Sequence, residues 1–388
     1  MCGITGYIDF KKNTSQGELE KMSHVLTHRG PDAFGLEVLE MENYQIGLGH
    51  RRLSIIDLSE GGKQPMSFKS YWICFNGEIY NYIELQKELI NLGHEFKTSS
   101  DTEVILHAYD QWGKNCLEKF IGMFAFTIMD TKLNKFFCAR DRAGVKPFFY
   151  YFKDGLFLFS SELKSFHEHK RFEKKLNISS VGAFMQYGNV PSPNCIFDFC
   201  FKLKPGHYIE LTLNDQDDLN QLFPKNQKAY WNVYDSYNKP KLNLSFEEAK
   251  KKTEEILIDA CNYRMVSDVP VGVFLSGGYD SASVTALLQK DRSDKLKTFT
   301  ISVPDIGLDE APYAKEIASY LGTNHTEINC THKEAINLIG DLPFYYDEPF
   351  ADSSAIPTTL VSLAARKHVT VALSADAGDE VFAGYNRY

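Results

Sequence analysis

The sequence predicts two domains of different class, a layered α+β domain followed by a doubly wound α/β domain. Its length of 388 residues exceeds what one compact core usually holds. The first 150 residues read as short strands broken by turns, with helical patterns between them. Strand and helix alternate after residue 244, and the polar stretch 202–244 predicts a connection between the domains.

Apolar runs bounded by turn residues predict the strands of the first domain, at residues 3–10, 46–51, 72–76, 125–130, 135–140 and 148–152. Apolar residues at three- and four-residue spacing predict helices at 18–28, 83–92 and 101–112. Asp101 stands where it would cap the last of these helices.

The second domain begins with a capping box, Ser245-x-x-Glu248, and a second box, Thr331-x-x-Glu334, opens a later helix. Strands are expected at 269–275, 298–303, 326–329 and 369–374, with helices at 245–263, 280–290, 311–321 and 357–368. This alternation predicts a parallel sheet, whose ligand crevice lies at the carboxyl ends of the strands.

Composition excludes several classes of function. Hydrophobic residues at 43% and charged residues at 24% are typical of a folded globular chain. The net charge of −9 repels phosphate backbones, so we expect no nucleic-acid partner. The basic cluster at 164–175 is interleaved with glutamates, which is typical of a solvated face. We expect a cytoplasmic protein without a membrane partner, because no apolar run approaches a membrane span and the amino terminus lacks a secretory pattern.

The eight cysteines form no C-x-x-C pair and have no histidines at metal-ligand spacing. This pattern argues against a zinc site or a disulfide framework and predicts reduced thiols, most of them small core residues. The exception is Cys2, because of its position. The chain also stops at Tyr388 directly after a motif, which suggests a fragment.

Removal of Met1 would leave the Cys2 thiol and a free α-amine on one residue. An α-amine has a pKa of about 7.7–8.0, so it can accept the thiol proton near neutrality. The sequence thus contains a candidate nucleophile with its own base. The alternative is an incidental small residue after the initiator.

Three later segments supply what attack on an amide needs. Asn76 and Gly77 could donate to one oxyanion, although Asn-Gly is also a common hairpin turn. The run His50-Arg51-Arg52 puts a guanidinium at a strand's end that could bind a carboxylate, although an arginine there could equally form a surface ion pair. The run Ser99-Ser100-Asp101-Thr102-Glu103 supplies a carboxylate that could hold an ammonium group as well as cap a helix.

These segments resemble the glutaminase domain of class II, amino-terminal-nucleophile glutamine amidotransferases. The resemblance rests on Met-Cys-Gly-Ile, Arg-Gly-Pro-Asp, Arg-Leu-Ser-Ile, Phe-Asn-Gly-Glu-Ile-Tyr-Asn, Ser-Asp-Thr-Glu and Gly-Met-Phe-Ala-Phe, in the family's order. It implies an Ntn-hydrolase αββα sandwich over residues 2–200, with Cys2 as nucleophile and Asn76 and Gly77 as the oxyanion hole. It further implies glutamine binding by Arg52 at the α-carboxylate, by Glu78 and Asp101 at the α-amino end, and by the backbone of Leu53, Ser54, Ile55 and Ile56.

A glycine-rich turn, Ser276-Gly277-Gly278-Tyr279-Asp280-Ser281, stands between a hydrophobic strand and a helix. Its backbone N–H groups and hydroxyls would suit phosphate oxygens, and the absence of a following lysine disfavours a kinase-like grip. A plain strand-to-helix turn is the alternative. A second loop after a strand carries Asp376 and Asp379, which could face the same crevice or simply cap a helix.

Ser-Gly-Gly-x-Asp-Ser resembles the pyrophosphatase (PP) loop of ATP-dependent adenylating ligases. From Cys2 to Tyr388 the chain resembles asparagine synthetases of the glutamine-hydrolysing type, with residues 201–244 as connection and 245–388 as a synthetase domain. The resemblance implies ATP and Mg²⁺ as cofactors, Mg²⁺ ligands at Asp280 and Asp379, and Asp376 beside the activated carboxylate. It implies nucleotide contacts at Leu275, Ser276, Gly277, Gly278, Ser281, Val303, Ser374 and Ala375. This chain has Ala375, Ala377 and Ala383 where the family usually has glycine, and Tyr279 where it has an aliphatic residue.

The leading hypothesis is therefore a ligase that hydrolyses glutamine at Cys2 and passes ammonia internally to an adenylated carboxylate. Aspartate is the default acceptor by resemblance. The stretch 347–357, expected to help shape the acceptor pocket, is similar to that of bacterial paralogues encoded with envelope polysaccharide genes, so a sugar uronate is the alternative acceptor. A glutaminase alone and a non-catalytic binding protein remain as other classes, and a homodimer is compatible with the sequence.

Overall fold

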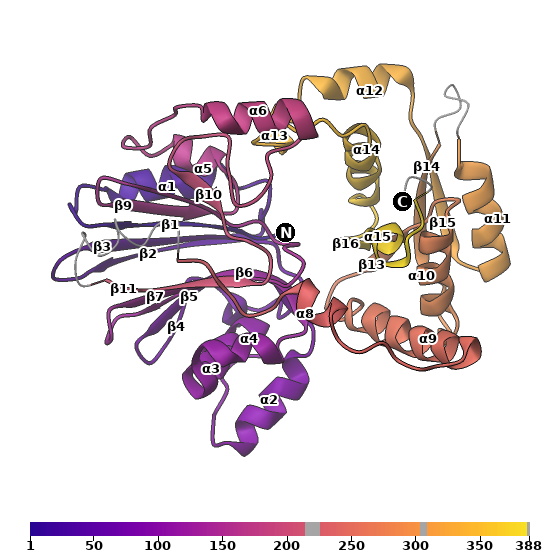
Figure 1. The fold of residues 1–388 in the computed structure, drawn as a ribbon, viewed down its shortest axis with the longest axis horizontal. Helices are drawn as coiled ribbons and strands as arrows, with labels where there is room; N and C mark the ends of the chain where they lie inside the picture. Colours follow the sequence, from indigo (N-terminus) through magenta and orange to yellow (C-terminus); the bar gives the residue numbers. More distant parts are fainter. Residues whose placement is uncertain (214–225, 303–308, 386–388) are drawn as a thin grey trace. The chain divides into compact units, whose positions relative to one another are not determined.

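The computed structural model describes residues 1–213, 226–302 and 309–385. The chain divides into two compact units, coloured from indigo to yellow along the sequence in Figure 1. One unit comprises Met1–Lys239 and Tyr346–Ala351, and the other Pro240–Tyr345 and Asp352–Tyr388. The short segment Tyr346–Ala351 thus belongs to the first unit although the chain on both sides of it belongs to the second.

The first unit contains two six-stranded sheets in which every strand pairing is antiparallel. The first sheet has the order β10-β8-β9-β1-β3-β2 and consists of β1 (Gly3–Asp9), β2 (Ala33–Glu40), β3 (Gln45–Arg52), β8 (Phe149–Lys153), β9 (Leu156–Ser160) and β10 (Cys200–Lys202). The second has the order β12-β11-β7-β6-β5-β4 and consists of β4 (Met66–Phe68), β5 (Tyr71–Ile79), β6 (Gly122–Asp130), β7 (Lys135–Arg140), β11 (His207–Thr212) and β12 (Lys228–Ala229).

Helices cover the outer face of each sheet (Figure 1). The first sheet carries α1 (Gln16–His24), α5 (Lys164–His167) and α6 (Ile178–Tyr187), and the second carries α2 (Tyr82–Asn91), α3 (Asp101–Trp112) and α4 (Cys116–Lys119). Short helices also occur at η1 (Glu60–Gly62), η2 (Gly113–Asn115) and α8 (Val233–Tyr237). A core between the sheets buries residues such as Ile4, Leu48, Met129 and Phe136, so the predicted αββα sandwich is confirmed.

The start of α3 differs from the prediction. Ser100, and not Asp101, is the capping residue, since its hydroxyl accepts from the backbone N–H of Thr102. Asp101 is the first helical residue, and its Oδ2 accepts from the backbone N–H of Ile79 at 3.0 Å. A neighbouring serine satisfies the helix end, which leaves the Asp101 carboxylate to face β5.

Several strands were not predicted from the sequence, among them β2 and β9. The region 201–244, expected to be a polar connection, also differs. Its strand β11 pairs with β7 from Tyr208 opposite Ala139 to Thr212 opposite Lys135, so this part completes the second sheet. Strands of this length form because a distant partner pairs with them, and local pattern does not report that partner. The polar run 214–225 lies outside the described residues.

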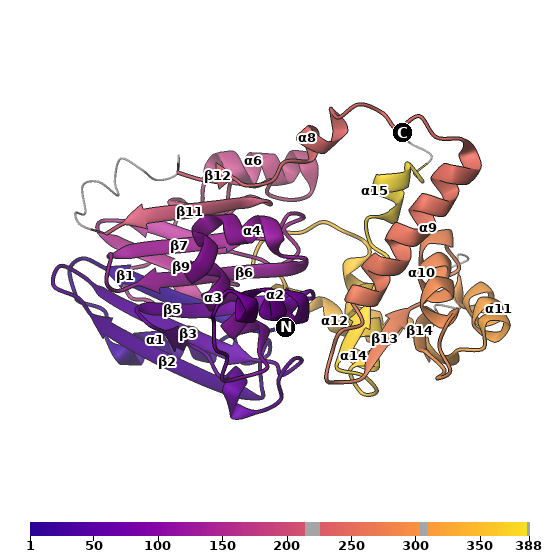
Figure 2. The ribbon, with the colours of Figure 1, turned by 90° about the horizontal axis from the view of Figure 1, so that it is seen from below.

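The second unit contains a parallel four-stranded sheet in the order β15-β14-β13-β16. Its strands are β13 (Val271–Phe274), β14 (Lys297–Ser302), β15 (Asn324–Asn329) and β16 (Val371–Leu373). Helices lie on both faces (Figures 1 and 2), and they are α9 (Phe246–Tyr263), α10 (Tyr279–Gln289), α11 (Ala311–Leu321), α12 (His332–Ile339), α13 (Leu342–Tyr345), α14 (Ala355–Ala365) and α15 (Gly378–Phe382). Both predicted capping boxes are present, at Ser245 and at Thr331. The doubly wound class is confirmed.

This strand order creates a switch point at the central strand. From β13 the chain builds outward to β14 and β15, and it then returns to place β16 on the other side of β13. The loops that follow β13 and β16 therefore diverge at the carboxyl edge, where open parallel sheets form ligand crevices.

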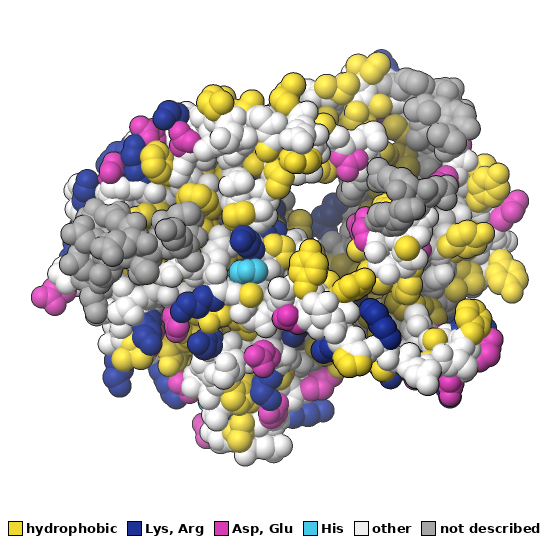
Figure 3. Space-filling view, in the orientation of Figure 1, with side chains coloured by type: hydrophobic (Ala, Val, Ile, Leu, Met, Phe, Trp, Pro, Cys, Tyr) yellow, Lys and Arg dark blue, Asp and Glu magenta, His cyan; other side chains and the backbone are white. Residues whose placement is uncertain are grey.

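The solvated face predicted for residues 164–175 is present only in part. Lys170 and Lys175 are exposed and pair with Glu18 and Asp198, whereas Arg171 pairs with the buried Asp9 and Lys164 is largely buried. Basic and acidic side chains are interspersed on the face drawn in Figure 3. Across the described part of the chain, none of the helices combines the length and the apolar composition needed to cross a membrane.

Candidate active sites

A narrow pocket in the first unit gathers residues from five separate stretches of sequence, at 1–2, 52–64, 75–78, 100–102 and 146. Nine residues predicted from the sequence line it: Cys2, Arg52, Leu53, Ile55, Ile56, Asn76, Gly77, Glu78 and Asp101. Ser54 does not. Its backbone N–H instead donates to Asp32 Oδ2 at 2.8 Å.

Cys2 lies directly before β1 and is partly exposed. Its sulfur contacts the backbone of Leu53, which donates its N–H to Sγ at 3.4 Å. Burial raises the pKa of the Cys2 thiol. The thiol is therefore protonated at neutral pH and needs a base before it can act as a nucleophile.

The amino terminus beside Cys2 has the properties of such a base. Burial lowers the pKa of the Met1 α-amine to about 5, with the charge of Cys2 opposing this effect and the positive charge of Arg29 adding to it. An amine in these surroundings is unprotonated at neutral pH. Once Met1 is removed, the α-amine belongs to Cys2 itself.

Asn76 and Gly77 lie within β5 and pair with Ala125 and Phe124 of β6. The strand was predicted to stop at residue 76 in a turn, but it continues to Ile79, so the hairpin alternative is wrong. The Asn76 side chain is fully buried, and neither its Oδ1 nor its Nδ2 has a hydrogen-bond partner among the described residues. A buried amide without a partner is costly, so this donor is available to a ligand. Residue 77 must be glycine, since a Cβ there would lie 2.2 Å from the Met123 carbonyl oxygen.

Arg52 ends β3, and backbone carbonyls orient its guanidinium. Nη1 donates to the Ser59 carbonyl at 2.7 Å, and Nη2 donates to the Asp57 carbonyl. The side chain is buried, and no carboxylate forms an ion pair with it among the residues described. The surface ion pair is therefore not observed, and the remaining N–H donors stay available to a ligand.

Two carboxylates, Glu78 and Asp101, are buried in the pocket wall. Burial raises the pKa of Glu78 to about 7, against the positive charge of Lys146 and the amino terminus. Burial also raises the pKa of Asp101 to about 7, with the charge of Glu78 adding to the effect. These carboxylates are poorly compensated in the free protein, so a bound ammonium group would stabilise their ionised forms.

Sequence reasoning missed part of the wall. Lys146 is 4% exposed and lines the pocket from the loop between β7 and β8. Gln64 accepts from the backbone N–H of Phe75 at 2.6 Å and donates to Thr102 Oγ1 at 3.1 Å, so it joins β5 to α3 behind the pocket. Arg29, within the Arg-Gly-Pro-Asp motif, donates its Nε–H to the Cys2 carbonyl at 2.9 Å. A lysine in a loop and a glutamine before a strand carry no local signal of these contacts.

A second cleft lies in the second unit, at the carboxyl edge of its sheet. Its volume is about 820 Å³, within the range of small-molecule sites. It brings together most residues predicted for the nucleotide, the metal and the activated carboxylate: Leu275, Ser276, Gly278, Asp280, Ser281, Ser374, Ala375, Asp376 and Asp379. Gly277 is in the same loop but not in the cleft lining. Val303 lies outside the described residues.

Hydrogen bonds hold the turn between β13 and α10 in shape. The Ser276 and Ser281 hydroxyls lie 2.8 Å apart, and the Gly278 N–H donates to Ser276 Oγ at 3.2 Å. The Gly277 N–H donates to a carboxylate oxygen of Glu310 at 3.3 Å. The loop therefore already offers a backbone donor to an anionic oxygen, as a phosphate cradle requires.

Asp280 and Asp379 reach the same cleft from different loops. Asp280 lies against the start of α15, because a Cβ on Gly378 would stand 2.1 Å from its Oδ2. No cluster of three or more potential metal ligands occurs among the described residues. Two carboxylates in a cleft of this volume nevertheless fit Mg²⁺, which usually takes one or two carboxylates and completes its coordination shell with phosphate oxygens and water.

Both halves match family models. Residues 1–231 match a glutamine amidotransferase domain, and residues 252–388 match asparagine synthase. Together with the fold, these matches define a class of protein in which a glutamine amidotransferase domain precedes an asparagine synthase domain.

Curated relatives define the family within this class. The chain is 43% identical to a putative glutamine-hydrolyzing asparagine synthetase 2 of Methanocaldococcus jannaschii, with 99% of this chain and 76% of the relative covered. It is 36% and 34% identical to glutamine-hydrolyzing asparagine synthetases 1 and 3 of Bacillus subtilis, covering 59% and 63% of those proteins and 100% and 99% of this chain. The chain belongs to the glutamine-hydrolysing asparagine synthetase family.

Proposed function

We propose that this protein is a glutamine-dependent amide-forming ligase that hydrolyses glutamine at Cys2 and delivers ammonia to a carboxylate activated by ATP. The buried Asn76 amide, which lines the same pocket as Cys2 and has no hydrogen-bond partner among the described residues, carries the proposal. Such a group costs free energy in the empty protein, and an oxyanion at the same place gives it a partner. Family membership gives the same assignment.

In the first half-reaction the Cys2 α-amine takes the thiol proton, and the sulfur attacks the side-chain carbonyl carbon of glutamine. Asn76 and the Gly77 backbone stabilise the oxyanion that forms. The carbon–nitrogen bond then breaks, the amine returns the proton to the leaving ammonia, and water hydrolyses the thioester to glutamate. Arg52 binds the α-carboxylate, and Glu78 and Asp101 bind the α-ammonium, as their positions around the pocket allow.

In the second half-reaction an acceptor carboxylate attacks the α-phosphorus of ATP and releases pyrophosphate. Ammonia then displaces AMP from the acyl adenylate. The turn 276–281 holds the phosphates, and Asp280 and Asp379 would hold Mg²⁺, which supplies charge neutralisation on the leaving pyrophosphate. Asp376, which lines the same cleft, faces the activated carboxylate.

Aspartate is the acceptor we propose first, since the relatives are named asparagine synthetases. A sugar uronate remains the alternative. The stretch 347–357 was expected to help shape the acceptor pocket, and Pro357 does line the cleft. Asp347 and Glu348, by contrast, belong to the first unit. A screen of carboxylates for pyrophosphate release therefore decides the acceptor.

The test of the function uses Cys2→Ala and Asn76→Ala in the full chain. Cys2→Ala should abolish glutamate formation while ammonium chloride still supports amide synthesis. Asn76→Ala should lower kcat for glutamine hydrolysis by about 10²–10³, the usual loss for one oxyanion donor. Full glutaminase activity in Cys2→Ala would contradict the proposal. Loss of ammonia-dependent synthesis as well as glutaminase activity in the same variant would also contradict it.

A further inference from the structure

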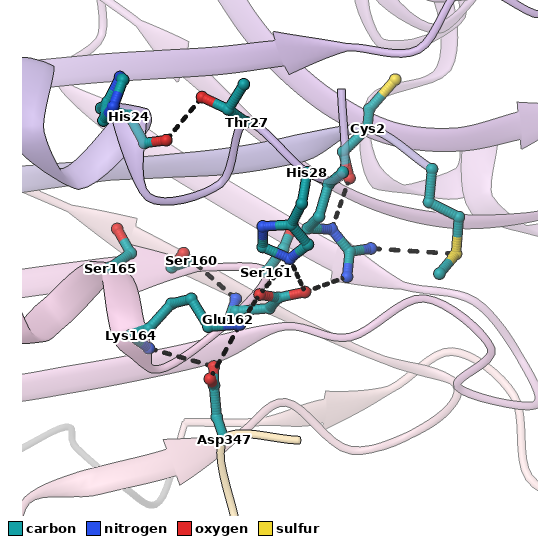
Figure 4. Close-up of polar contacts among 12 residues, drawn as sticks. Cys2, His24, Thr27, His28, Ser160, Ser161, Glu162, Lys164, Ser165 and Asp347 are labelled. Atoms are coloured by element: carbon teal, nitrogen blue, oxygen red, sulfur yellow. Dashed lines mark hydrogen bonds and ion pairs between the residues drawn. The ribbon is translucent and has the colours of Figure 1, made fainter. Parts of the chain in front are cut away.

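A chain of charged side chains leads from Cys2 to the segment Tyr346–Ala351 (Figure 4). It begins at the Cys2 carbonyl, which accepts from Arg29 Nε at 2.9 Å. Arg29 Nη1 pairs with Glu162 Oε1 at 2.6 Å. Lys164 Nζ lies 2.5 Å from the other oxygen of Glu162 and 3.2 Å from Asp347 Oδ1.

Glu162 is the centre of this chain. Burial raises its pKa, but the hydrogen bond from His28 and the charges of Arg29 and Lys164 outweigh burial and bring the pKa to about 2. The carboxylate is therefore ionised at any physiological pH. The loop that carries it is joined to the strand of the nucleophile, since Ile4 of β1 exchanges hydrogen bonds with Ser161.

Asp347 fixes the far end of the chain. Its side chain is 7% exposed, and both of its oxygens contact Lys164, one at Nζ and the other at the backbone N–H at 3.1 Å. Lys164 is thus held between two carboxylates, and the four charges of Arg29, Glu162, Lys164 and Asp347 balance. Neutralising Asp347 would leave Lys164 to compete with Arg29 for Glu162, and Arg29 would shift on the Cys2 carbonyl.

Other contacts hold the segment Tyr346–Ala351 in place without involving Arg29, Glu162, Lys164 or Asp347. Glu348 accepts from the backbone N–H of Ile196 at 2.7 Å and pairs with Lys202. The Ala351 N–H donates to the Gly188 carbonyl at 2.8 Å. Docking of the segment and the link to Cys2 can therefore be separated by mutation.

We propose that Asp347 is a positioning residue for the Cys2 nucleophile, acting through Lys164, Glu162 and Arg29. The inference rests on the proposed function of Cys2 and deepens it. The segment lies between α13 and α14 of the second unit, and α14 contributes Pro357, Thr358 and Val361 to the nucleotide cleft. Placement of the nucleophile consequently depends on a segment that is continuous with the ATP-binding half of the chain.

The test compares Asp347→Asn with Glu348→Gln in the full chain. Asp347→Asn should lower kcat for glutamine hydrolysis about tenfold while KM for glutamine changes less than about twofold, because the thiol is displaced and the substrate contacts are kept. Glu348→Gln, the matched control, should keep kcat within about twofold. Alkylation of Cys2 by a diazo-ketone glutamine analogue should slow in parallel with kcat. Asp347→Glu, which keeps the charge, should recover most of the rate.

A double-variant cycle guards against a general loss of folding. In a Lys164→Met background the ammonium group that joins Glu162 to Asp347 is already absent, so Asp347→Asn should cause little further loss of kcat. The role of Asp347 would be overturned by equal losses of kcat in Asp347→Asn and Glu348→Gln, or by an Asp347→Asn variant whose kcat is unchanged or whose KM alone rises. Additive losses of kcat in the double-variant cycle would overturn it as well. If the wild type neither hydrolyses glutamine nor reacts at Cys2, the proposed function fails, and this inference with it.

Discussion

At the scale of single residues, the pocket proposed for glutamine combines groups that are each unfavourable in the empty protein. Burial raises the pKa values of Glu78 and Asp101 to about 7, and the Asn76 amide has no hydrogen-bond partner among the described residues. A glutamine molecule carries the complementary groups, an ammonium for the carboxylates and a developing oxyanion for the amide. The binding free energy of the substrate thus offsets costs that folding left in place.

Glutamine affinity should therefore depend on pH. Below pH 7 both carboxyls are protonated and cannot compensate an ammonium, whereas above pH 7 they are ionised, so affinity should rise with pH. One group with a pKa of about 7 changes affinity about tenfold between pH 6 and pH 8, and two groups change it more steeply. Calorimetric titration of Cys2→Ala with glutamine measures this without turnover. Glu78→Gln should flatten the profile, and a dissociation constant that does not change from pH 6 to pH 8 would contradict the role of the carboxylates.

The pocket residues found by sequence reasoning share a property. Cys2, Arg52 and Asp101 stand beside strand ends or helix starts, where chain geometry already suggests an accessible functional group, whereas Asn76 lies inside β5. Lys146 enters the pocket only because β7 and β8 belong to different sheets and the loop between them crosses its mouth. Such a position depends on tertiary pairing, which no local pattern contains.

At the scale of elements, both capping boxes and the parallel pairing of the second sheet were predictable, because they depend on local hydrogen bonds and on strand–helix alternation. The antiparallel domain was harder. Its strands β9 and β11 are short; β11 pairs with the distant β7, and β9 pairs with the distant β1 as well as with the adjacent β8. The cap of α3 was misassigned because Ser100 and Asp101 are adjacent and both suit the position.

Both ends of α15, which follows the cleft loop after β16, contain a strained backbone conformation. Ala377 and Ala383 adopt left-handed backbone conformations, with φ of 73° and 56°, whereas Ala375 does not. These are two of the positions where the family usually has glycine. Ala377→Gly should stabilise the second unit by about 0.5–1 kcal/mol, because glycine adopts this conformation without a Cβ clash.

Unfolding of the second unit can be measured separately from that of the first. All three tryptophans, at 72, 112 and 231, lie in the first unit, so their fluorescence reports its unfolding. Unfolding of the second unit in urea is then the circular dichroism transition that tryptophan fluorescence does not report. Ala377→Gly should move this transition to a higher urea concentration. Ala375→Gly is the matched control and should give no stabilisation. A gain in Ala375→Gly equal to that in Ala377→Gly would show that left-handed strain is not the cause.

At the scale of the whole molecule, the two proposed half-reactions belong to separate units of one chain. Among the described residues, the pocket of the first unit is lined by none from the second, and the cleft of the second by none from the first. Each half-reaction should therefore survive the loss of the other, and only ammonia needs to pass between them.

Asp280→Asn should abolish pyrophosphate release while glutamine hydrolysis continues, because removal of one carboxylate charge weakens the Mg²⁺–pyrophosphate site and leaves the Cys2 pocket intact. An equimolar mixture of Asp280→Asn and Cys2→Ala then measures how ammonia travels. If it passes internally, the ammonia that one variant releases is diluted in bulk water, and the mixture should make amide from glutamine at a small fraction of the wild-type rate until ammonium chloride is added. A mixture that matches the wild type at micromolar protein would show that ammonia moves through solution, and unaltered pyrophosphate release in Asp280→Asn would remove that carboxylate from the proposed metal site.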